Sequence, residues 1–305
     1  MTDIATGSGA ALAAPGARVL PPVFEALRRL SGRLGTGPLA RRGASILRRL
    51  ACLGRADPID VELFPGHWAR LHPRDNLSEK RAFASLQHWD VAERAALAEA
   101  IAGGPRPFVF VDAGANVGLY SLAARAAGGA EAVRVVAIEP DPVTRARLGF
   151  NLGAAPAGAP VSIVGAALSA EPGTLRLTAA GRNRGEVRVA GPEGDGVAVP
   201  ARTLLEIAKA EALPRIDALK IDIEGAEAPV LRAFFEMAPV RLWPALVLIE
   251  APRGIETQAL ALLRAKGYAV AGRTKLNAIL TAPRYPGSPS PAAAERSGDR
   301  MHGEA

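Results

Sequence analysis

The chain has 305 residues, of which 49% are hydrophobic, so it is long enough to bury a sizeable core as one large domain or two small ones. No apolar run reaches the roughly 18 residues of a membrane-spanning helix, and the N-terminus lacks the basic start of a secretory signal, so we expect a cytoplasmic protein. The single cysteine, Cys52, excludes an internal disulfide framework and a multi-cysteine zinc site.

The net charge of +7 is concentrated at one end of the chain. Residues 1–56 contain nine arginines and two acids, whereas the remaining residues carry 28 basic and 28 acidic side chains. A nucleic-acid-binding domain usually shows a basic patch on its main body. We therefore expect no nucleic-acid partner for the main domain.

The N-terminal extension, residues 1–56, divides into two parts by composition. Residues 1–22 are rich in Gly, Ala and Pro and are predicted to be disordered. Residues 23–54 show apolar side chains at helical spacing with arginines between them, and four of these fall near one face: Leu39, Ile46, Leu50 and Leu53. Such a helix suits peripheral contact with a membrane or a partner, but it also suits a helical cap packed on the main domain, and both interpretations stay open.

The main domain is predicted to span residues 57–281, with 282–305 as a disordered tail. It begins with short strands and turns up to about residue 83, followed by a helix over 90–103. Apolar strand-like runs then occupy 108–112, 134–139, 161–169, 216–222 and 245–250, and helices are predicted to begin near Val117, Pro142, Thr203, Ala226 and Ile255. Continuously apolar strands that alternate with helices indicate a doubly wound parallel α/β sheet, with its core from about residue 107. Residues 268–283 indicate a closing antiparallel hairpin.

The stretch "VDAGANVG" joins the first core strand to its helix. Asp112 ends the strand, at the sheet edge where ligands bind in open α/β folds. Gly114 permits a tight turn, Asn116 tolerates a left-handed conformation, and Gly118 lets the helix start pack closely. A dinucleotide fingerprint would have glycine at 116 and Gly or Ala at 119, where this chain has Asn116 and Leu119, which weighs against a nicotinamide dehydrogenase.

A second acid, Glu139, ends the next strand of the predicted sheet. A carboxylate in that position can accept hydrogen bonds from both hydroxyls of a ribose. Asp112 and Glu139 around a glycine turn, without a phosphate-binding loop, indicate S-adenosylmethionine as the cofactor. The alternative is that both acids only cap helices.

An acidic cluster follows the fourth core strand in "KIDIEGAE". It contains Asp222, Glu224 and Glu227, and Glu250 ends the neighbouring strand. One carboxylate could be a general base for a hydroxyl acceptor, several could bind a divalent cation, or they could bind the cofactor and start the next helix. Asp222 is the first candidate for a catalytic role and Glu224 the second, and no metal site is predicted.

Two other groups of side chains have open roles. His67 and His72 precede the core sheet, where either could be a base or a structural residue. Residues 181–196 form an insert whose arginines could contact an anionic acceptor or lie on a solvated hairpin, namely Arg182, Arg184 and Arg188.

The sequence resembles the FkbM family of S-adenosylmethionine-dependent methyltransferases. The resemblance covers about residues 75–282 and is carried in family order by "FVDAGANVGLYSL", "VVAIEPDPVTRARLGFNL", "GAALS", "LKIDIEGAEAPVL" and "LVLIE". It implies a Rossmann-like class I methyltransferase fold, a seven-stranded, mostly parallel sheet with an antiparallel last strand and helices on both faces. It also implies O-methylation of a small-molecule or saccharide acceptor, such as a sugar in a polysaccharide or glycolipid, or a secondary metabolite.

The resemblance also implies roles for single residues. Asp112, Gly114, Asn116 and Gly118 would shape the methionine side of the cofactor pocket. Glu139 would hold the ribose, Ala166 and Ala167 would lie by the adenine, Asp222 would lie close to the reacting methyl group, and Asn151 would be structural. A methyltransferase for RNA ribose and a non-catalytic module that binds the cofactor or a partner remain as alternatives.

Overall fold

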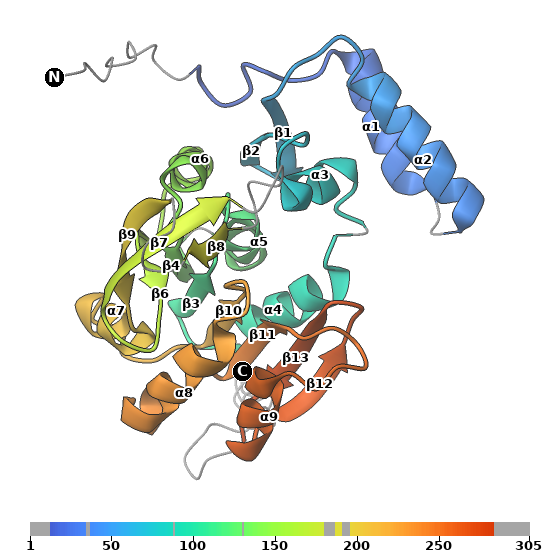
Figure 1. The fold of residues 1–305 in the computed structure, drawn as a ribbon. Helices are drawn as coiled ribbons and strands as arrows, with labels where there is room; N and C mark the ends of the chain where they lie inside the picture. The colour runs from blue at the N-terminus through green and yellow to red at the C-terminus, as the bar shows by residue number, and fades with distance from the viewer. Residues whose placement is uncertain are drawn as a thin grey trace, which may run out of the picture. The chain divides into compact units, whose positions relative to one another are not determined.

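The computed structural model describes residues 13–34, 37–87, 89–129, 131–179, 187–190 and 196–283. The chain divides into two compact units, Met1–Trp89 and Asp90–Ala305 (Figure 1). Residues 57–89, predicted from the sequence to open the main domain, therefore group with the N-terminal helices in the first unit.

The first two helices of this unit, α1 (Pro22–Arg33) and α2 (Pro38–Ala51), lie side by side (Figure 1). Each starts with a proline, whose missing N–H is not needed in a first helical turn. They confirm the helical structure predicted from the spacing of apolar residues in 23–54. No helix in the described parts of the chain is long and apolar enough to cross a membrane.

Residues 13–20 have a defined place in the first unit, although their composition predicts disorder. The Arg70 guanidinium donates to the carbonyl oxygens of Ala13 and Ala14 at 2.8 and 3.2 Å, and Val19 forms a β-bridge with Asp60. Arg70 and Asp60 are themselves a buried ion pair at 2.7 Å. Hydrogen bonds from a side chain distant in the sequence thus hold these small residues in place, although they have little apolar surface to pack. Residues 1–12 lie outside the described residues.

The rest of the first unit is a β-hairpin and a short helix. Strands β1 (Ile59–Phe64) and β2 (His67–Leu71) pair antiparallel, and α3 (Leu77–Ala84) follows. The helix corrects the prediction of strands and turns throughout this region. Asn76 caps it by accepting from the Glu79 backbone N–H at 3.1 Å, a local signal of a helix start that the sequence does contain.

The second unit is built on a seven-stranded sheet in the order β12-β13-β11-β10-β3-β4-β5. The strands from β11 to β5 run parallel and β13 runs antiparallel to both its neighbours, which confirms the predicted class I arrangement and the closing hairpin. The strands are β3 (Phe108–Ala113), β4 (Val133–Ile138), β5 (Val161–Val164), β10 (Ala218–Ile221), β11 (Leu246–Glu250), β12 (Ala269–Arg273) and β13 (Asn277–Thr281).

Helices cover both faces of this sheet. Val109 and Val111 of β3 belong to the core that includes Leu204, Leu231 and Leu260 from α7, α8 and α9. The alternate residues of the strands face α4 and α5, which pack on each other and on the sheet. The helices are α4 (Val91–Gly103), α5 (Leu119–Gly128), α6 (Pro142–Gly153), α7 (Leu204–Ala210), α8 (Glu227–Met237), the short 3-10 helix η1 (Val240–Leu242) and α9 (Gln258–Ala265). Predicted helix starts agree except for α9, which begins after Thr257, its cap, rather than near Ile255.

The predicted strand over 161–169 is wrong, because the chain changes sheets within it. β5 ends at Val164, and β6 (Ala167–Leu168) pairs with β9 in a four-stranded sheet of order β6-β9-β7-β8. Both parts are mostly apolar, so the sequence looks like one continuous strand, although Ile163 of β5 is exposed. The other strands of this sheet are β7 (Gly173–Ala179), β8 (Val187–Ala190) and β9 (Val197–Arg202).

Candidate functional site

The strand order of the large sheet reverses at β3. The strands that follow β3 first in the sequence, β4 and β5, lie on one side of it, whereas the later strands β10 and β11 lie on its other side. Asp112, near the carboxyl end of β3, is in register with Lys220 on β10 and with Ala137 on β4. Such a reversal leaves a crevice at the carboxyl ends of the strands, and it is the usual ligand-binding position in open α/β sheets.

Asp112 is almost completely buried at this edge, with 1% of its surface exposed. Its Oδ2 accepts hydrogen bonds from the backbone N–H and the hydroxyl of Ser121, at 3.1 and 2.7 Å, so one oxygen serves the first turn of α5. Its Oδ1 is buried and has no hydrogen-bond partner among the residues that the structure describes. Burial raises the pKa of Asp112, while Lys220 and Ser121 counteract the rise. A buried carboxylate oxygen without a donor favours a ligand that brings one.

The turn after Asp112 has the backbone that its sequence predicts. Gly114, Asn116 and Gly118 all have positive φ, of 73°, 51° and 87°. A Cβ on Gly114 would lie 1.9 Å from the Asp222 carbonyl oxygen, so only glycine fits where this turn crosses the end of β10. The backbone N–H groups of Gly114 and Ala115 both donate to the Ile138 carbonyl at 3.0 Å, which fixes the turn against β4.

Glu139 follows β4 and is 6% exposed. Its two carboxylate oxygens accept from the backbone N–H groups of Asn116 and Asp141, each at 2.9 Å. Burial, the largest influence, raises its pKa from 4.5 to about 7. Glu139 does not cap α6, because that role belongs to Asp141, which accepts from Thr144 at 2.7 Å. Helix capping therefore does not account for Glu139.

Lys220 is a buried cation in this cluster that was not singled out in the sequence. Its Nζ donates to the Gly114 carbonyl oxygen at 2.8 Å and lies 3.3 Å from Asp222 Oδ2. Although burial lowers the pKa of Lys220, the carboxylates of Asp222 and Asp112 raise it above its usual value. The available signal was the one basic residue within the apolar run "IDALKID".

The acidic cluster after β10 separates into different environments. The Asp222 side chain is 45% exposed, and Glu224 is exposed with a positive φ of 58°. Glu227 is buried, and its Oε1 accepts from the backbone N–H groups of Ile223 and Gly225 at 2.8 and 3.3 Å. These bonds hold the turn that leads into α8, so Glu227 has the helix-starting role rather than that of a base or a metal ligand. Glu250 is exposed at the end of β11. Within the described residues, no group of three or more His, Cys, Asp or Glu side chains could hold a metal ion.

Three small or amide residues complete this edge of the sheet. The Glu139 N–H donates to the Val164 carbonyl oxygen at 3.1 Å, so the chain passes beside Glu139 just before the buried Ala166 and Ala167. Asn151 is fully buried and donates from Nδ2 to the Val117 carbonyl at 2.9 Å. A hydrogen bond to the backbone of this turn is what a structural role for Asn151 predicts.

The two histidines considered as bases have partners within the first unit. His67 Nδ1 lies 2.9 Å from the Pro65 carbonyl oxygen, and His72 Nδ1 lies 3.5 Å from Glu79. Neither contact indicates a catalytic role. Arg182 and Arg184 lie outside the described residues, as does the side chain of Arg188.

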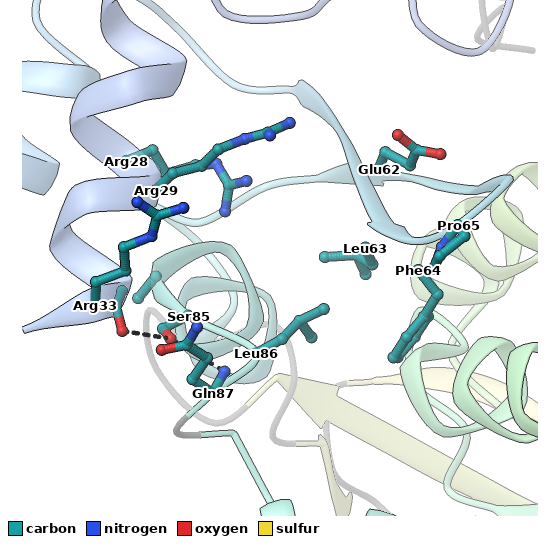
Figure 2. Close-up of a pocket in the computed structure, with 12 residues that line it drawn as sticks. Arg28, Arg29, Arg33, Glu62, Leu63, Phe64, Pro65, Ser85, Leu86 and Gln87 are labelled. Atoms are coloured by element: carbon teal, nitrogen blue, oxygen red, sulfur yellow. Dashed lines mark hydrogen bonds between the residues drawn. The ribbon is translucent and has the colours of Figure 1, made fainter.

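The first unit also contains a pocket of about 430 Å³ between α1, β1 and the segment after α3 (Figure 2). Arg28, Arg29 and Arg33 line one side of it and Glu62 another. Glu25 pairs with Arg28 at 2.7 Å and with Arg29 at 2.8 Å. None of the site residues predicted from the sequence lines this pocket.

A family model and a sequence relative both match this chain. The family model for the methyltransferase FkbM domain matches residues 112–269, just over half of the chain. The methyltransferase sdnD of Sordaria araneosa is 32% identical over 193 residues, which are 53% of this chain and 73% of that protein.

Two solved structures are similar at lower identity. The precorrin-6y C5,15-methyltransferase of Geobacter metallireducens GS-15 has 18% identity and a TM-score of 0.37, over 63% of this chain and 87% of its own. The methyltransferase FkbM of Methylobacillus flagellatus KT has 16% identity and a TM-score of 0.36, over 85% of this chain and 58% of its own. These values are too low to add to the assignment, which rests on the family model and the sequence relative. On that basis the chain belongs to the FkbM methyltransferase family.

Proposed function

We propose that this chain binds S-adenosylmethionine at the edge formed by Asp112, Glu139 and Asp222. We further propose that it methylates a hydroxyl group of a sugar, glycolipid, polysaccharide or secondary metabolite. One observation carries the proposal. Within the described parts of the chain, the buried Asp112 keeps an oxygen without a donor, one strand from the buried Glu139, where the strand order reverses.

The chemistry of these residues fits the cofactor. Asp112 Oδ1 would accept from the ammonium of the methionine part, and the turn at Gly114 would let that part approach the backbone. Glu139 would accept from the ribose hydroxyls with the lone pairs that its two backbone donors leave unused. The small side chains of Ala166 and Ala167 would leave room for the adenine. When bound, the cofactor supplies a methyl group activated by a positively charged sulfur.

The protein's own task in the reaction is to hold the acceptor and take its proton. An alcohol is a weak nucleophile until a base removes its proton in the transition state. Asp222 is partly exposed at the end of β10, so one of its carboxylate oxygens could receive that proton, while Lys220 anchors the side chain. Glu224, exposed on the following turn, is the second candidate.

Calorimetric titration with S-adenosylhomocysteine tests cofactor binding. Micromolar binding corresponds to about −8 kcal/mol. Loss of one charged hydrogen-bond partner in Asp112→Asn or Glu139→Gln should weaken it by about 1.5–3 kcal/mol, or ten- to hundredfold. Asp217→Asn is the matched control, because Asp217 is also buried but lies at the opposite, amino end of β10. A folded wild-type protein that does not bind would contradict the proposal.

Methyl transfer to hydroxyl acceptors tests the second half of the proposal. We expect Asp222→Asn to lose roughly 10²–10⁴-fold in kcat, because it removes the base. Its affinity for S-adenosylhomocysteine should fall by no more than about tenfold, because the amide keeps the size of the side chain and loses only the charge that faces Lys220. Glu236→Gln, at an exposed position of α8, is the control. Full activity of Asp222→Asn would exclude Asp222 as the base, and then Glu224→Gln should show the loss.

A further inference from the structure

We propose that the outward face of α2 docks the protein on an anionic membrane surface. This face, here called the leucine face, consists of Leu39, Ile46 and Leu50 on α2 and Leu53 just after it. Their exposed fractions are 80%, 58%, 44% and 68%. The proposal goes beyond the methyltransferase activity and does not depend on cofactor binding.

The leucine face reverses the usual orientation of a helix in a folded unit. Among the α2 residues whose burial the structure describes, Ala44 and Ala51 are buried, at 7% and 0% exposure, Leu47 is half-buried, and the three large apolar residues of the leucine face are exposed. An amphipathic helix normally buries its large apolar residues against its own core. A contiguous exposed apolar stripe is instead typical of a binding surface.

The charges beside the leucine face select the kind of partner. Residues 26–56 carry eight arginines and no acidic residue. Arg42 and Arg49 are exposed on α2, each three residues after an apolar residue of the leucine face, and neither forms an ion pair within the described residues. At a bilayer surface the apolar side chains would enter the boundary between headgroups and acyl chains, while guanidinium groups would meet the lipid phosphates.

The length and charge of α2 argue against other arrangements. The helix has 14 residues, or about 21 Å at 1.5 Å per residue, which suits lying on a bilayer rather than crossing its roughly 30 Å core. A second copy of the chain would place two arginine-rich faces against each other, which like-charge repulsion disfavours. An anionic lipid surface satisfies both the apolar residues and the arginines.

Co-sedimentation of the full chain with vesicles tests the proposal. We expect binding to phosphatidylcholine vesicles that contain one-third phosphatidylglycerol, weaker binding to pure phosphatidylcholine, and loss of binding in high salt, which screens charges. Ile46→Glu with Leu50→Glu, and separately Arg42→Gln with Arg49→Gln, should each weaken binding by about tenfold or more.

Matched variants in the second unit are the controls. Met237→Glu with Val240→Glu changes two apolar residues that are 73% and 50% exposed, and Arg232→Gln with Arg241→Gln removes two exposed arginines. Both should bind as the wild type does, and circular dichroism should show every variant folded. Absence of wild-type binding to the anionic vesicles would overturn the proposal. Binding of the α2 variants equal to that of the wild type would also overturn it. A third contrary outcome is a wild-type protein that is dimeric and does not bind vesicles, and that the Ile46→Glu, Leu50→Glu double variant converts to monomers.

Discussion

At the scale of single residues, burial determines how readily Glu139, the proposed ribose ligand, is protonated. Two backbone N–H groups hold its oxygens in place, yet burial outweighs them and raises its pKa to about 7. In the protein without ligand, Glu139 is therefore protonated more readily than an ordinary glutamate. A ligand with two hydroxyl groups that donate hydrogen bonds to Glu139 would favour the ionised carboxylate.

Glu139 should make the stability of the ligand-free protein depend on pH. Its pKa is 4.5 in the unfolded chain and about 7 in the folded one, so the folded state binds the proton more tightly between these values. The free energy of unfolding should fall as pH rises from about 4.5 to about 7, by roughly 3 kcal/mol from this group, and then level off. Urea unfolding at pH 5 and pH 8 measures this change.

Glu139→Gln is the reference for this measurement, because it keeps the shape of the side chain but cannot ionise in this range. Asp112 and Asp217 also have raised pKa values, but they contribute to both proteins alike. The difference between the two proteins should therefore shrink at low pH, where Glu139 is neutral. Parallel pH profiles would show that Glu139 titrates near its ordinary value.

At the scale of elements, Lys220 joins β10 to the turn between β3 and α5. Its ammonium contacts the Gly114 carbonyl oxygen and Asp222, so one side chain fixes two segments that both carry proposed ligand contacts. Asp112, in register with Lys220 on the neighbouring strand, is a second carboxylate close to this ammonium, besides Asp222. The parts of the site thus depend on each other through a buried cation.

Lys220→Met should destabilise the protein by about 1–3 kcal/mol, because it leaves the Gly114 carbonyl oxygen without its donor and the buried Asp112 carboxylate without its neighbouring cation. It should also weaken binding of S-adenosylhomocysteine, since the turn at Gly114 loses an anchor. Urea unfolding and calorimetry measure the two effects. Lys209→Met, at an exposed position of α7, should change stability by no more than about 0.5 kcal/mol. A Lys220→Met protein as stable as this control would show that the contacts of Lys220 contribute nothing net.

At the scale of the whole molecule, charge and chemistry belong to different units. Residues 1–89 carry thirteen basic and seven acidic residues, whereas residues 90–305 carry 24 and 23. The nearly neutral second unit holds the family's motif residues, and the basic first unit holds the leucine face. This division matches a catalytic unit joined to a unit that could locate it at an anionic surface.

Features that depend on neighbouring residues could be read from the sequence. Thr203 and Glu206 form the capping box at the start of α7, and Asn116 adopts the left-handed conformation expected from its type. Asp112 and Glu139 fall together because parallel strands end at one edge, which strand–helix alternation already implies. Sequence alone thus determined the sheet, its glycine turn and its two principal acids.

Features that depend on distant residues were decided only by the tertiary structure. Lys220 meets Gly114 across 106 positions of the chain, and Arg70 orders Ala13 across 57. The run 161–169 divides between two sheets because its second half finds β9, a strand that local pattern does not reveal as its partner. Helical spacing likewise placed Leu39 and Ile46 on one face, but only packing determined that this face points outward, because periodicity records which residues share a side and not what covers it.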